Sequence, residues 1–184
     1  MTTLRIETER LILRPMQMED VNDLLEYQSN PEIVRYIPWP PRTLEQVKTA
    51  AEDVVKTCTF QLKEDKDYIV LVWALKSNGK VIGQSNMGLV SKENKCANIG
   101  WVTHQDFQRQ GYAFEASKAL LNYAFTNTDV HRVIADIDSR VPHSAVLAEK
   151  LGMRREATFL DGEFFKGEWC DMWLYAILKS EFSA

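Results

Sequence analysis

The segment Gln108-Arg109-Gln110-Gly111-Tyr112-Ala113 decides how the rest of this chain is interpreted. Strand-like residues 97–103 precede it. Apolar residues at helical spacing follow it, namely Ala113, Ala116, Leu120, Leu121, Ala124 and Phe125. The segment is therefore predicted to be a short loop that joins a strand to the N-terminus of a helix.

Such a loop is suited to binding a phosphate group. The first N–H groups of a helix have no intrahelical acceptor, and the helix dipole adds about half a positive charge at that end. Gly111 lets the backbone approach an anion closely, and Arg109 adds a cation. Taken alone, the six residues fit an ordinary strand-to-helix turn with a surface arginine equally well, because short glycine motifs are common by chance.

Length and composition indicate one globular domain over residues 1–184, with 45% hydrophobic and 26% charged residues. The net charge is -4 and no basic block stands out, which argues against a nucleic-acid-binding surface. A mildly acidic protein is compatible with a cationic substrate such as an amine.

The cysteines and the N-terminal residues predict a cytoplasmic protein. Cys58, Cys96 and Cys170 are odd in number and have no CxxC spacing, so neither a disulfide framework nor a zinc site is expected. Residues 1–5 lack the apolar core of a signal peptide. No run reaches the roughly 20 apolar residues that span a bilayer, so no membrane contact is expected.

Hydrophobic patterning predicts a mixed α/β domain, because the strands first form an antiparallel meander and then alternate with helices. Strands are predicted over residues 5–14, 68–75, 81–90, 96–103, 131–137, 153–159 and 166–178. Helices are predicted over residues 18–27, from the cap Thr43 to about 62, from the glycine loop to about 126, and over 142–151. Turns are expected at residues 77–80, 93–95 and 161–162.

Five segments follow one another in the order known from a protein family. They are residues 8–14 (TERLILR), 99–104 (IGWVTH), 110–116 (QGYAFEA), 147–153 (LAEKLGM) and 162–171 (GEFFKGEWCD). This series resembles the GNAT acetyltransferase superfamily, and within it the ribosomal-protein N-terminal acetyltransferases of the Rim type. The resemblance implies a single GNAT-like domain with a mixed, mostly antiparallel sheet of about seven strands, helices on both faces and a splayed central strand pair.

The resemblance also implies acetyl-CoA as the cosubstrate, with no metal. The family places the pyrophosphate on the loop formed here by Gln108, Arg109, Gln110, Gly111, Tyr112 and Ala113. The pantetheine arm runs beside the strand formed here by Trp101, Val102 and Thr103, with a backbone N–H near Val102 as the expected donor to the thioester carbonyl. That strand splays from residues 133–137, which leaves backbone groups for the two amides of the arm.

Two residues depart from the family pattern. Asn98 stands where the family often has Glu, and a neutral amide cannot act as a general base. Val141 stands where the family often has Asn, so a hydrogen bond to the pantetheine is expected to be lost. Glu163 is then the predicted base, and Ser144, at the head of a helix beside the thiol, the predicted proton donor and cofactor contact. The alternatives are a solvated hairpin carboxylate for Glu163 and a helix cap for Ser144.

Other reactive side chains have weaker claims. His104 ends the cofactor strand, where a histidine is more often a structural residue than a catalytic one. Asp106 is expected to cap the loop, whereas Glu168 and Asp171 suit pairing with arginines. A cysteine nucleophile lacks the His and Asn partners that it would need.

The weak base bears on the identity of the acceptor amine. At pH 7, deprotonation costs about 1.2 kcal/mol for a peptide α-amine and about 4.6 kcal/mol for a lysine side chain. We therefore expect the acceptor to be a protein N-terminus, such as that of a ribosomal protein. The enzyme itself is expected to be a monomer or a homodimer. A small-amine acetyltransferase (polyamine, amino acid or aminoglycoside) and a non-catalytic acyl-CoA-binding module are the alternatives. A dinucleotide-binding protein is disfavoured, because the loop lacks G-x-G-x-x-G.

Overall fold

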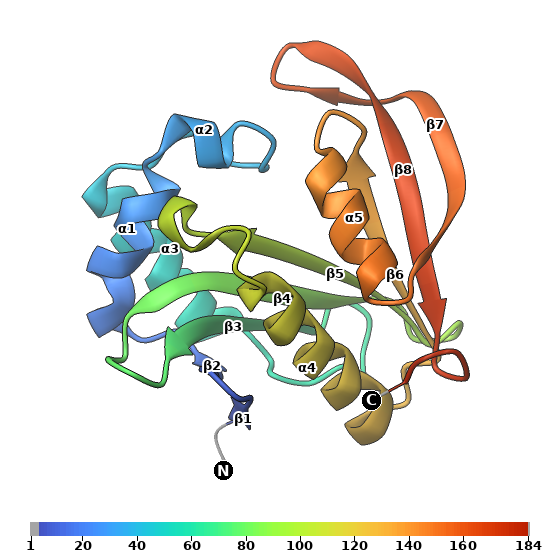
Figure 1. Ribbon diagram of the computed structural model, residues 1–184, viewed down its shortest axis with the longest axis horizontal. Helices are drawn as coiled ribbons and strands as arrows, with labels where there is room; N and C mark the ends of the chain where they lie inside the picture. The colour runs from blue at the N-terminus through green and yellow to red at the C-terminus, as the bar shows by residue number, and fades with distance from the viewer. Residues whose placement is uncertain (1–3, 184) are drawn as a thin grey trace.

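The apolar runs of the sequence form the central strands of one sheet (Figure 1). The computed structural model describes residues 4–183. The eight strands are β1 (Ile6–Glu7), β2 (Leu11–Pro15), β3 (Tyr68–Leu75), β4 (Val81–Ser91), β5 (Cys96–Thr103), β6 (Arg132–Asp138), β7 (Arg154–Phe165) and β8 (Glu168–Leu178). Their order in the sheet is β1-β2-β3-β4-β5-β6-β8-β7. Every neighbouring pair is antiparallel except β5 and β6.

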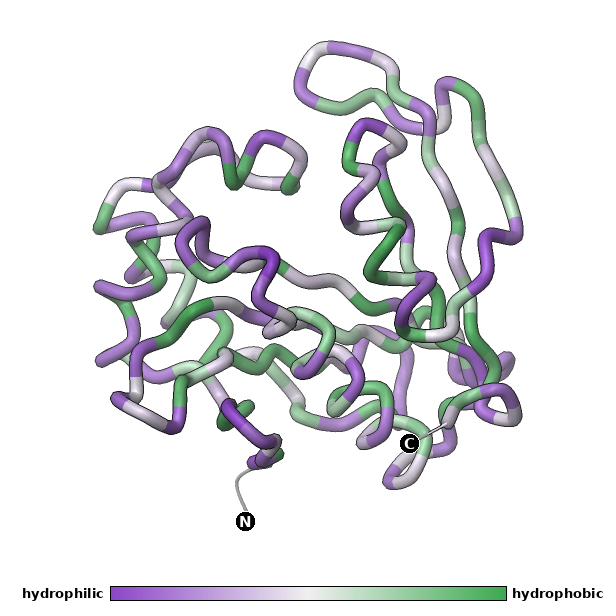
Figure 2. Tube along the Cα trace, viewed as in Figure 1, coloured by the Kyte–Doolittle hydropathy of each residue, from purple (hydrophilic) through white to green (hydrophobic). Residues whose placement is uncertain are grey.

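Helices cover both faces of the sheet, as predicted. They are η1 (Met18–Asp20), α1 (Val21–Gln28), α2 (Pro31–Val34), α3 (Leu44–Thr57), η2 (Gln105–Phe107), α4 (Tyr112–Asn127) and α5 (Pro142–Lys150). One core packs α4 and α5 against side chains such as Trp73 and Val133. A second core packs α1 and α3 against Val72 and its neighbours on the other face. β3 is apolar throughout because both of its faces are covered, and Figure 2 shows this hydrophobic centre.

The central strands β5 and β6 separate from each other after a short paired stretch. Their parallel pairing runs only from Cys96↔Arg132 to Asn98↔Ile134. Beyond it, β5 continues to Thr103 and β6 to Asp138 without pairing with each other, and Figure 1 shows the two strands diverging. The predicted splayed pair is confirmed.

The N-terminal strand prediction is wrong in one respect, because residues 5–14 form two strands. The N–H of Thr8 donates to the carbonyl of Leu11 at 3.0 Å, and the Thr8 hydroxyl accepts the N–H of Leu11 at 3.0 Å. This tight turn makes β1 and β2 a short hairpin, which is why the sheet has eight strands and not seven.

Two further boundaries differ from the predictions. α3 ends at Thr57 and not near residue 62, because Cys58 is extended and the Phe60 N–H donates to the carbonyl of Tyr68 in β3. The last hairpin turns at Lys166-Gly167, where both residues have positive φ, and not at residues 161–162. Residues 161–162 are instead an irregularity inside β7, so Glu163 lies in a strand.

Within residues 4–183, no helix combines the length and the apolar character that crossing a bilayer requires.

Candidate active site

A cleft of about 1320 Å³ opens where β5 and β6 diverge. Its walls come from the ends of these strands, the first residues of α4 and α5, and the segment that links α1 to α3. Most of the predicted site residues line it, namely Trp101, Val102, Thr103, Gln108, Arg109, Gly111, Tyr112, Ala113 and Ser144. Gln110 and Glu163 are outside the lining.

The loop before α4 presents backbone donors and a cation to this cleft. Gly111 is the N-cap of α4 with φ at 85°, and no side chain caps the helix. The Glu115 N–H donates to the Gly111 carbonyl at 3.0 Å, so the N–H groups of Tyr112 and Ala113 precede the first helical bond. Arg109 adds its guanidinium to the same wall. The predicted strand–loop–helix is confirmed, and it has the properties of an anion site.

A carboxylate in the first turn of α4 ties this loop to the N-terminal hairpin. Glu115 accepts hydrogen bonds from the Thr8 hydroxyl at 2.6 Å, the Arg10 N–H at 2.7 Å and the Arg10 Nε at 2.7 Å. Burial favours the neutral acid, but these hydrogen bonds outweigh it and lower the pKa of Glu115. Arg10 also donates to the carbonyl of Gln110 and lies 4.1 Å from the centre of the Tyr112 ring.

Thr8 and Arg10 lie in the segment of residues 8–14, and Glu115 lies in that of residues 110–116. The sequence alone indicated no role for these three side chains. Their function is to position the loop, and only their contact in space reveals it.

The glutamines of the loop support the loop itself. Gln108 Nε2 donates to the carbonyl of Thr103 at 3.3 Å, which joins the loop to the end of β5. Gln110 Nε2 donates to the carbonyl of Asp106 at 2.8 Å, so this side chain is turned away from the cleft.

After Asn98, no strand of residues 4–183 lies beside the edge of β5 that faces the cleft. β4 pairs with the opposite edge through Gln84↔Val102 and Gly83↔Thr103. Backbone groups on such a free edge can pair with another extended molecule, as a sheet edge does. Trp101, Val102 and Thr103 therefore offer the open edge that an extended amide-bearing ligand needs.

The two residues that depart from the family pattern lie on opposite walls of the cleft. Asn98 Oδ1 accepts the N–H of Gly88 at 3.1 Å, so its amide carbonyl is engaged with β4. Val141 is the N-cap of α5 and provides no side-chain cap. Ser144 is the third residue of α5 and is therefore not its N-cap. It lines the cleft.

Glu163 is placed by β7 on the solvent side of the last hairpin. It pairs in register with Cys170, whose thiol donates to the Glu163 carbonyl at 3.3 Å. Its side chain is exposed.

Sequence analysis missed two carboxylates that line the cleft from β6. Val133, Ala135 and Ile137 are buried against α4 and α5, so the alternate residues Asp136 and Asp138 face the other way. Burial raises the pKa of Asp138, but hydrogen bonds from Arg140 outweigh this effect and lower it. Among residues 4–183, Asp136 has no such partner, and desolvation raises its pKa. The alternation in residues 132–138 was the available signal for both carboxylates.

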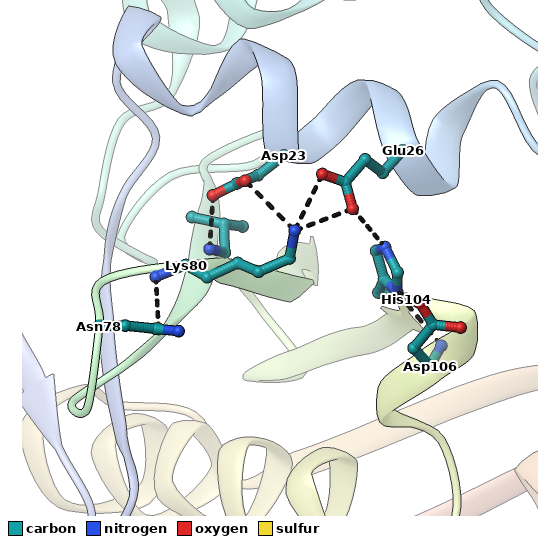
Figure 3. A network of polar contacts seen from close by, with 7 residues as sticks. Asp23, Glu26, Asn78, Lys80, His104 and Asp106 are labelled. Atoms are coloured by element: carbon teal, nitrogen blue, oxygen red, sulfur yellow. Dashed lines mark hydrogen bonds and ion pairs between the residues drawn. The ribbon is translucent and has the colours of Figure 1, made fainter.

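His104 belongs to a structural network and not to the cleft (Figure 3). The side chain is buried, and its Nδ1 accepts the Asp106 N–H at 3.2 Å, which caps η2. The proton is therefore on Nε2, which donates to Glu26 at 2.9 Å. Glu26 also accepts from Lys80, and both contacts lower the pKa of Glu26. The cap of η2 is thus His104, whereas Asp106 was expected.

The remaining candidates are structural as well. Glu168 contacts Arg140, as expected, whereas Asp171 accepts the N–H of Asp161 at 2.9 Å instead of pairing with an arginine. Burial raises the pKa of the thiols of Cys58, Cys96 and Cys170, which is the opposite of what activates a nucleophile.

Comparison with known proteins agrees with this geometry. The family model of the acetyltransferase (GNAT) domain matches residues 10–154. The chain belongs to the GNAT acetyltransferase family. It is also similar to the uncharacterised N-acetyltransferase YnaD of Bacillus subtilis (strain 168), with 30% identity over 98% of this chain and 100% of YnaD. The protein is therefore an acetyl-CoA-dependent N-acetyltransferase.

Solved GNAT structures confirm the fold. An acetyltransferase (GNAT family) from Bacillus anthracis has a TM-score of 0.86 at 29% identity, over 97% of this chain and 100% of that chain. Two others are similar in fold alone. The ribosomal-protein-S5-alanine acetyltransferase of Vibrio fischeri has a TM-score of 0.77 at 19% identity, over 98% of this chain and 100% of that one. The spermidine N-acetyltransferase of Vibrio cholerae, in complex with CoA and spermine, has a TM-score of 0.77 at 18% identity, over 93% and 96%.

The site of this GNAT acetyltransferase fits the cosubstrate of its family. A diphosphate finds uncapped N–H groups and Arg109 at the start of α4, and an extended amide chain finds the free edge of β5. Within the described part of the chain, no group of three or more His, Cys, Asp and Glu side chains is arranged to hold a metal ion.

Proposed function

We propose that this N-acetyltransferase acts on the α-amine of a protein or peptide N-terminus, as in a ribosomal protein. The observation that carries the proposal is Asp136, a carboxylate with a raised pKa at the divergence of β5 and β6. A base of this kind is moderate in strength. It suits an amine with a pKa of about 7.7–8.0 better than a lysine or polyamine nitrogen with a pKa near 10.4.

The cosubstrate site in this proposal has two parts. Gln108, Arg109, Gln110, Gly111, Tyr112 and Ala113 form the diphosphate loop. Trp101, Val102 and Thr103 offer backbone groups to the pantetheine arm, and Ser144 lies across the cleft on α5. Acetyl-CoA supplies the acetyl group as an activated thioester.

The residues of the chain then have separate tasks. A backbone N–H near Val102 stabilises the negative charge that develops on the acyl oxygen. Asp136 accepts the proton of the attacking amine, directly or through water. The Ser144 hydroxyl donates a proton to the departing thiolate and regains one from water, so that the products are the amide and the free thiol. Glu163 is the second candidate base, and Asp136 is favoured over it because Asp136 lines the cleft.

A free-thiol release assay with acetyl-CoA tests the acceptor. The panel consists of a peptide with a free α-amine and no lysine, a peptide with a blocked α-amine and one lysine, and spermidine. We expect the highest kcat/KM for the free α-amine between pH 7 and 8. A higher kcat/KM for the lysine peptide or for spermidine would contradict the proposal.

A further inference from the structure

Arg42 is held in a defined position in the wall of the cleft that the segment between α1 and α3 forms. Its backbone N–H donates to the carbonyl of Gln28 at 3.0 Å, and its Nη1 donates to Gln28 Oε1 at 2.9 Å. The guanidinium lies over the ring of Trp39, 4.6 Å from the centroid. Arg42, Gln28 and Trp39 all line the cleft, so this cation is positioned before any ligand arrives.

The groups that orient Arg42 are neutral. Gln28 Nε2 donates to Gln84 Oε1 at 3.1 Å, and the Tyr27 hydroxyl donates to the same oxygen at 2.9 Å. This arrangement leaves Gln28 Oε1 to face the guanidinium. Only Nη1 of the guanidinium has a hydrogen bond to another side chain within residues 4–183, so Nε and Nη2 remain for a ligand.

Arg42 differs from most arginines of the fold because no carboxylate neutralises it. Those that contact a carboxylate are Arg5, Arg10, Arg14, Arg132, Arg140 and Arg154. Within residues 4–183, no carboxylate lies within ion-pair distance of Arg42, although the side chain is partly buried. A desolvated cation without a counter-charge is unfavourable, and an anion that enters the cleft would relieve it.

The hydrogen-bond chain from Arg42 ends beside the reacting centre. Gln84 lies on β4 directly opposite Val102 of β5, near which the proposed donor to the thioester lies. The core that packs α1 and α3 includes Val102, whereas α4 packs on the other face of the sheet. Arg42 therefore lies on the α1–α3 side of the sheet, whereas Arg109 lies on the loop before α4.

The opposite rim carries a second unneutralised cation. Lys166, in the turn between β7 and β8, donates from Nζ to the carbonyl of Val34 at 2.7 Å and to that of Trp39 at 3.0 Å. This contact joins the hairpin to the loop that leads to Arg42, and burial lowers the pKa of Lys166. Within residues 4–183, no carboxylate forms an ion pair with Lys166. Lys166 and Arg42 thus place two cations beside Trp39, where they can attract an anionic group of the acceptor.

We propose that Arg42 binds a carboxylate of the acceptor, so that the substrate class is an α-amine accompanied by a nearby carboxylate. This inference rests on the proposed acetylation of an α-amine. The carboxylate has two possible sources, the C-terminus of a free amino acid or dipeptide, or an acidic side chain near a protein N-terminus. A guanidinium suits either source, because its planar N–H groups match the two oxygens of a carboxylate.

The test measures kcat/KM on matched acceptors that differ only in the carboxylate. Ala-Ala is compared with Ala-Ala amide, and a peptide amide that begins Ala-Asp is compared with one that begins Ala-Asn. The wild-type enzyme is expected to prefer the acid of at least one pair by about 10-fold or more. The pair that shows the preference identifies the source, and equal kcat/KM within both pairs would overturn the proposal.

Two substitutions assign the preference to Arg42. Arg42→Gln should remove it, mainly by lowering kcat/KM for the acid about 10- to 100-fold, while Arg42→Lys should retain part of it. Arg35→Gln is the matched control, because Arg35 is exposed and stacks on Tyr36 in the same segment but does not line the cleft. An Arg42→Gln enzyme that is folded, as shown by an unchanged acetyl-CoA Kd, and keeps the preference would refute the assignment.

Calorimetric titration of the CoA-loaded enzyme with Ala-Ala and its amide separates this inference from the proposed function. Tighter binding of the acid that depends on Arg42 supports the subsite, even if thiol release shows no transfer to any α-amine. Turnover of α-amines without any acid preference supports the proposed function and overturns the subsite.

Discussion

Asp136 and Asp138 lie two residues apart on β6 and share one face of the sheet, yet their environments shift their pKa values in opposite directions. Hydrogen bonds from Arg140 keep Asp138 ionised. In the described part of the chain, no hydrogen bond or ion pair offsets the desolvation of Asp136. Asp138 is therefore a stable partner of Arg140, and Asp136 is the carboxylate that can exchange a proton.

Asp136→Asn should lower kcat by about 10²–10⁴-fold with little change in the Kd of acetyl-CoA. The loss should shrink for acceptors with more acidic ammonium groups, because these enter the cleft already neutral. Glu163→Gln serves as the comparison and is expected to keep most of the activity. A large loss in Glu163→Gln and a small one in Asp136→Asn would move the base to Glu163.

The raised pKa of Asp136 also predicts an effect on stability. A folded-state pKa above the unfolded value favours folding while the acid is protonated, and this contribution is lost as the pH rises through the folded pKa. At pH 7 the partly desolvated charge of Asp136 opposes folding, so Asp136→Asn should be slightly more stable to urea than the wild type. The difference should vanish toward pH 3, where both side chains are neutral. A less stable variant at pH 7 would show that Asp136 has a structural partner.

A substitution of Arg109 tests the proposed cosubstrate loop at the scale of single residues. Arg109→Ala removes one charge-assisted contact but leaves the backbone donors of α4, so acetyl-CoA binding should weaken by about 1.5–3 kcal/mol. Calorimetry with CoA and dephospho-CoA shows which phosphate the guanidinium contacts. An unchanged Kd for both would make Arg109 an ordinary surface charge.

At the scale of elements, the start of α4 depends on a hairpin about a hundred residues away in sequence. Glu115 joins the two through Thr8 and Arg10, and this contact holds the loop that precedes the helix. The loop before α4 is thus anchored to the β1–β2 hairpin by these hydrogen bonds.

Glu115→Gln should destabilise the protein by about 1.5–3 kcal/mol at pH 7, because a partly buried charge-assisted network is lost. The pKa of Glu115 is lowered on folding, so its contribution is present above the unfolded pKa and lost as the pH falls through the folded one. Urea unfolding at pH 7 and at acidic pH measures this difference. The exposed ion pair between Arg5 and Glu7 provides the control. Glu7→Gln should lower the free energy of unfolding by much less. Equal effects would show that Glu115 is not an anchor.

The elements that sequence alone predicted well are those whose signals are local. β3 and β5 match the predicted residues because continuous apolar or alternating runs define them. The end of α3 was missed because residues after Thr57 pair with Tyr68, which is a contact distant in sequence. The last hairpin was misplaced because Asp161-Gly162 has the composition of a turn, whereas the side chain of Asp171 accepts the Asp161 N–H and keeps that segment within β7.

At the scale of the whole molecule, the divergence of β5 and β6 opens the sheet between two helical layers. The loop before α4 contributes cosubstrate donors from one layer, and the α1–α3 segment contributes Arg42 from the other. The family pattern in the sequence pointed to β5 and the loop before α4, and most of the residues named there line the cleft, although Gln110 does not. The other walls were not predicted, because the alternation of residues 132–138 indicates which side chains of β6 share a face but not that Asp136 and Arg42 line the same cleft.

The most direct test of the central claim is the position of the acetyl group on a peptide that has both a free α-amine and a lysine. The peptide is incubated with enzyme and acetyl-CoA at pH 7.5, and tandem mass spectrometry locates the modification. The account predicts acetylation of the α-nitrogen, at a rate that falls about 10²–10⁴-fold in Asp136→Asn. Acetylation of the lysine side chain, or of the α-nitrogen at an unchanged rate in Asp136→Asn, would contradict it.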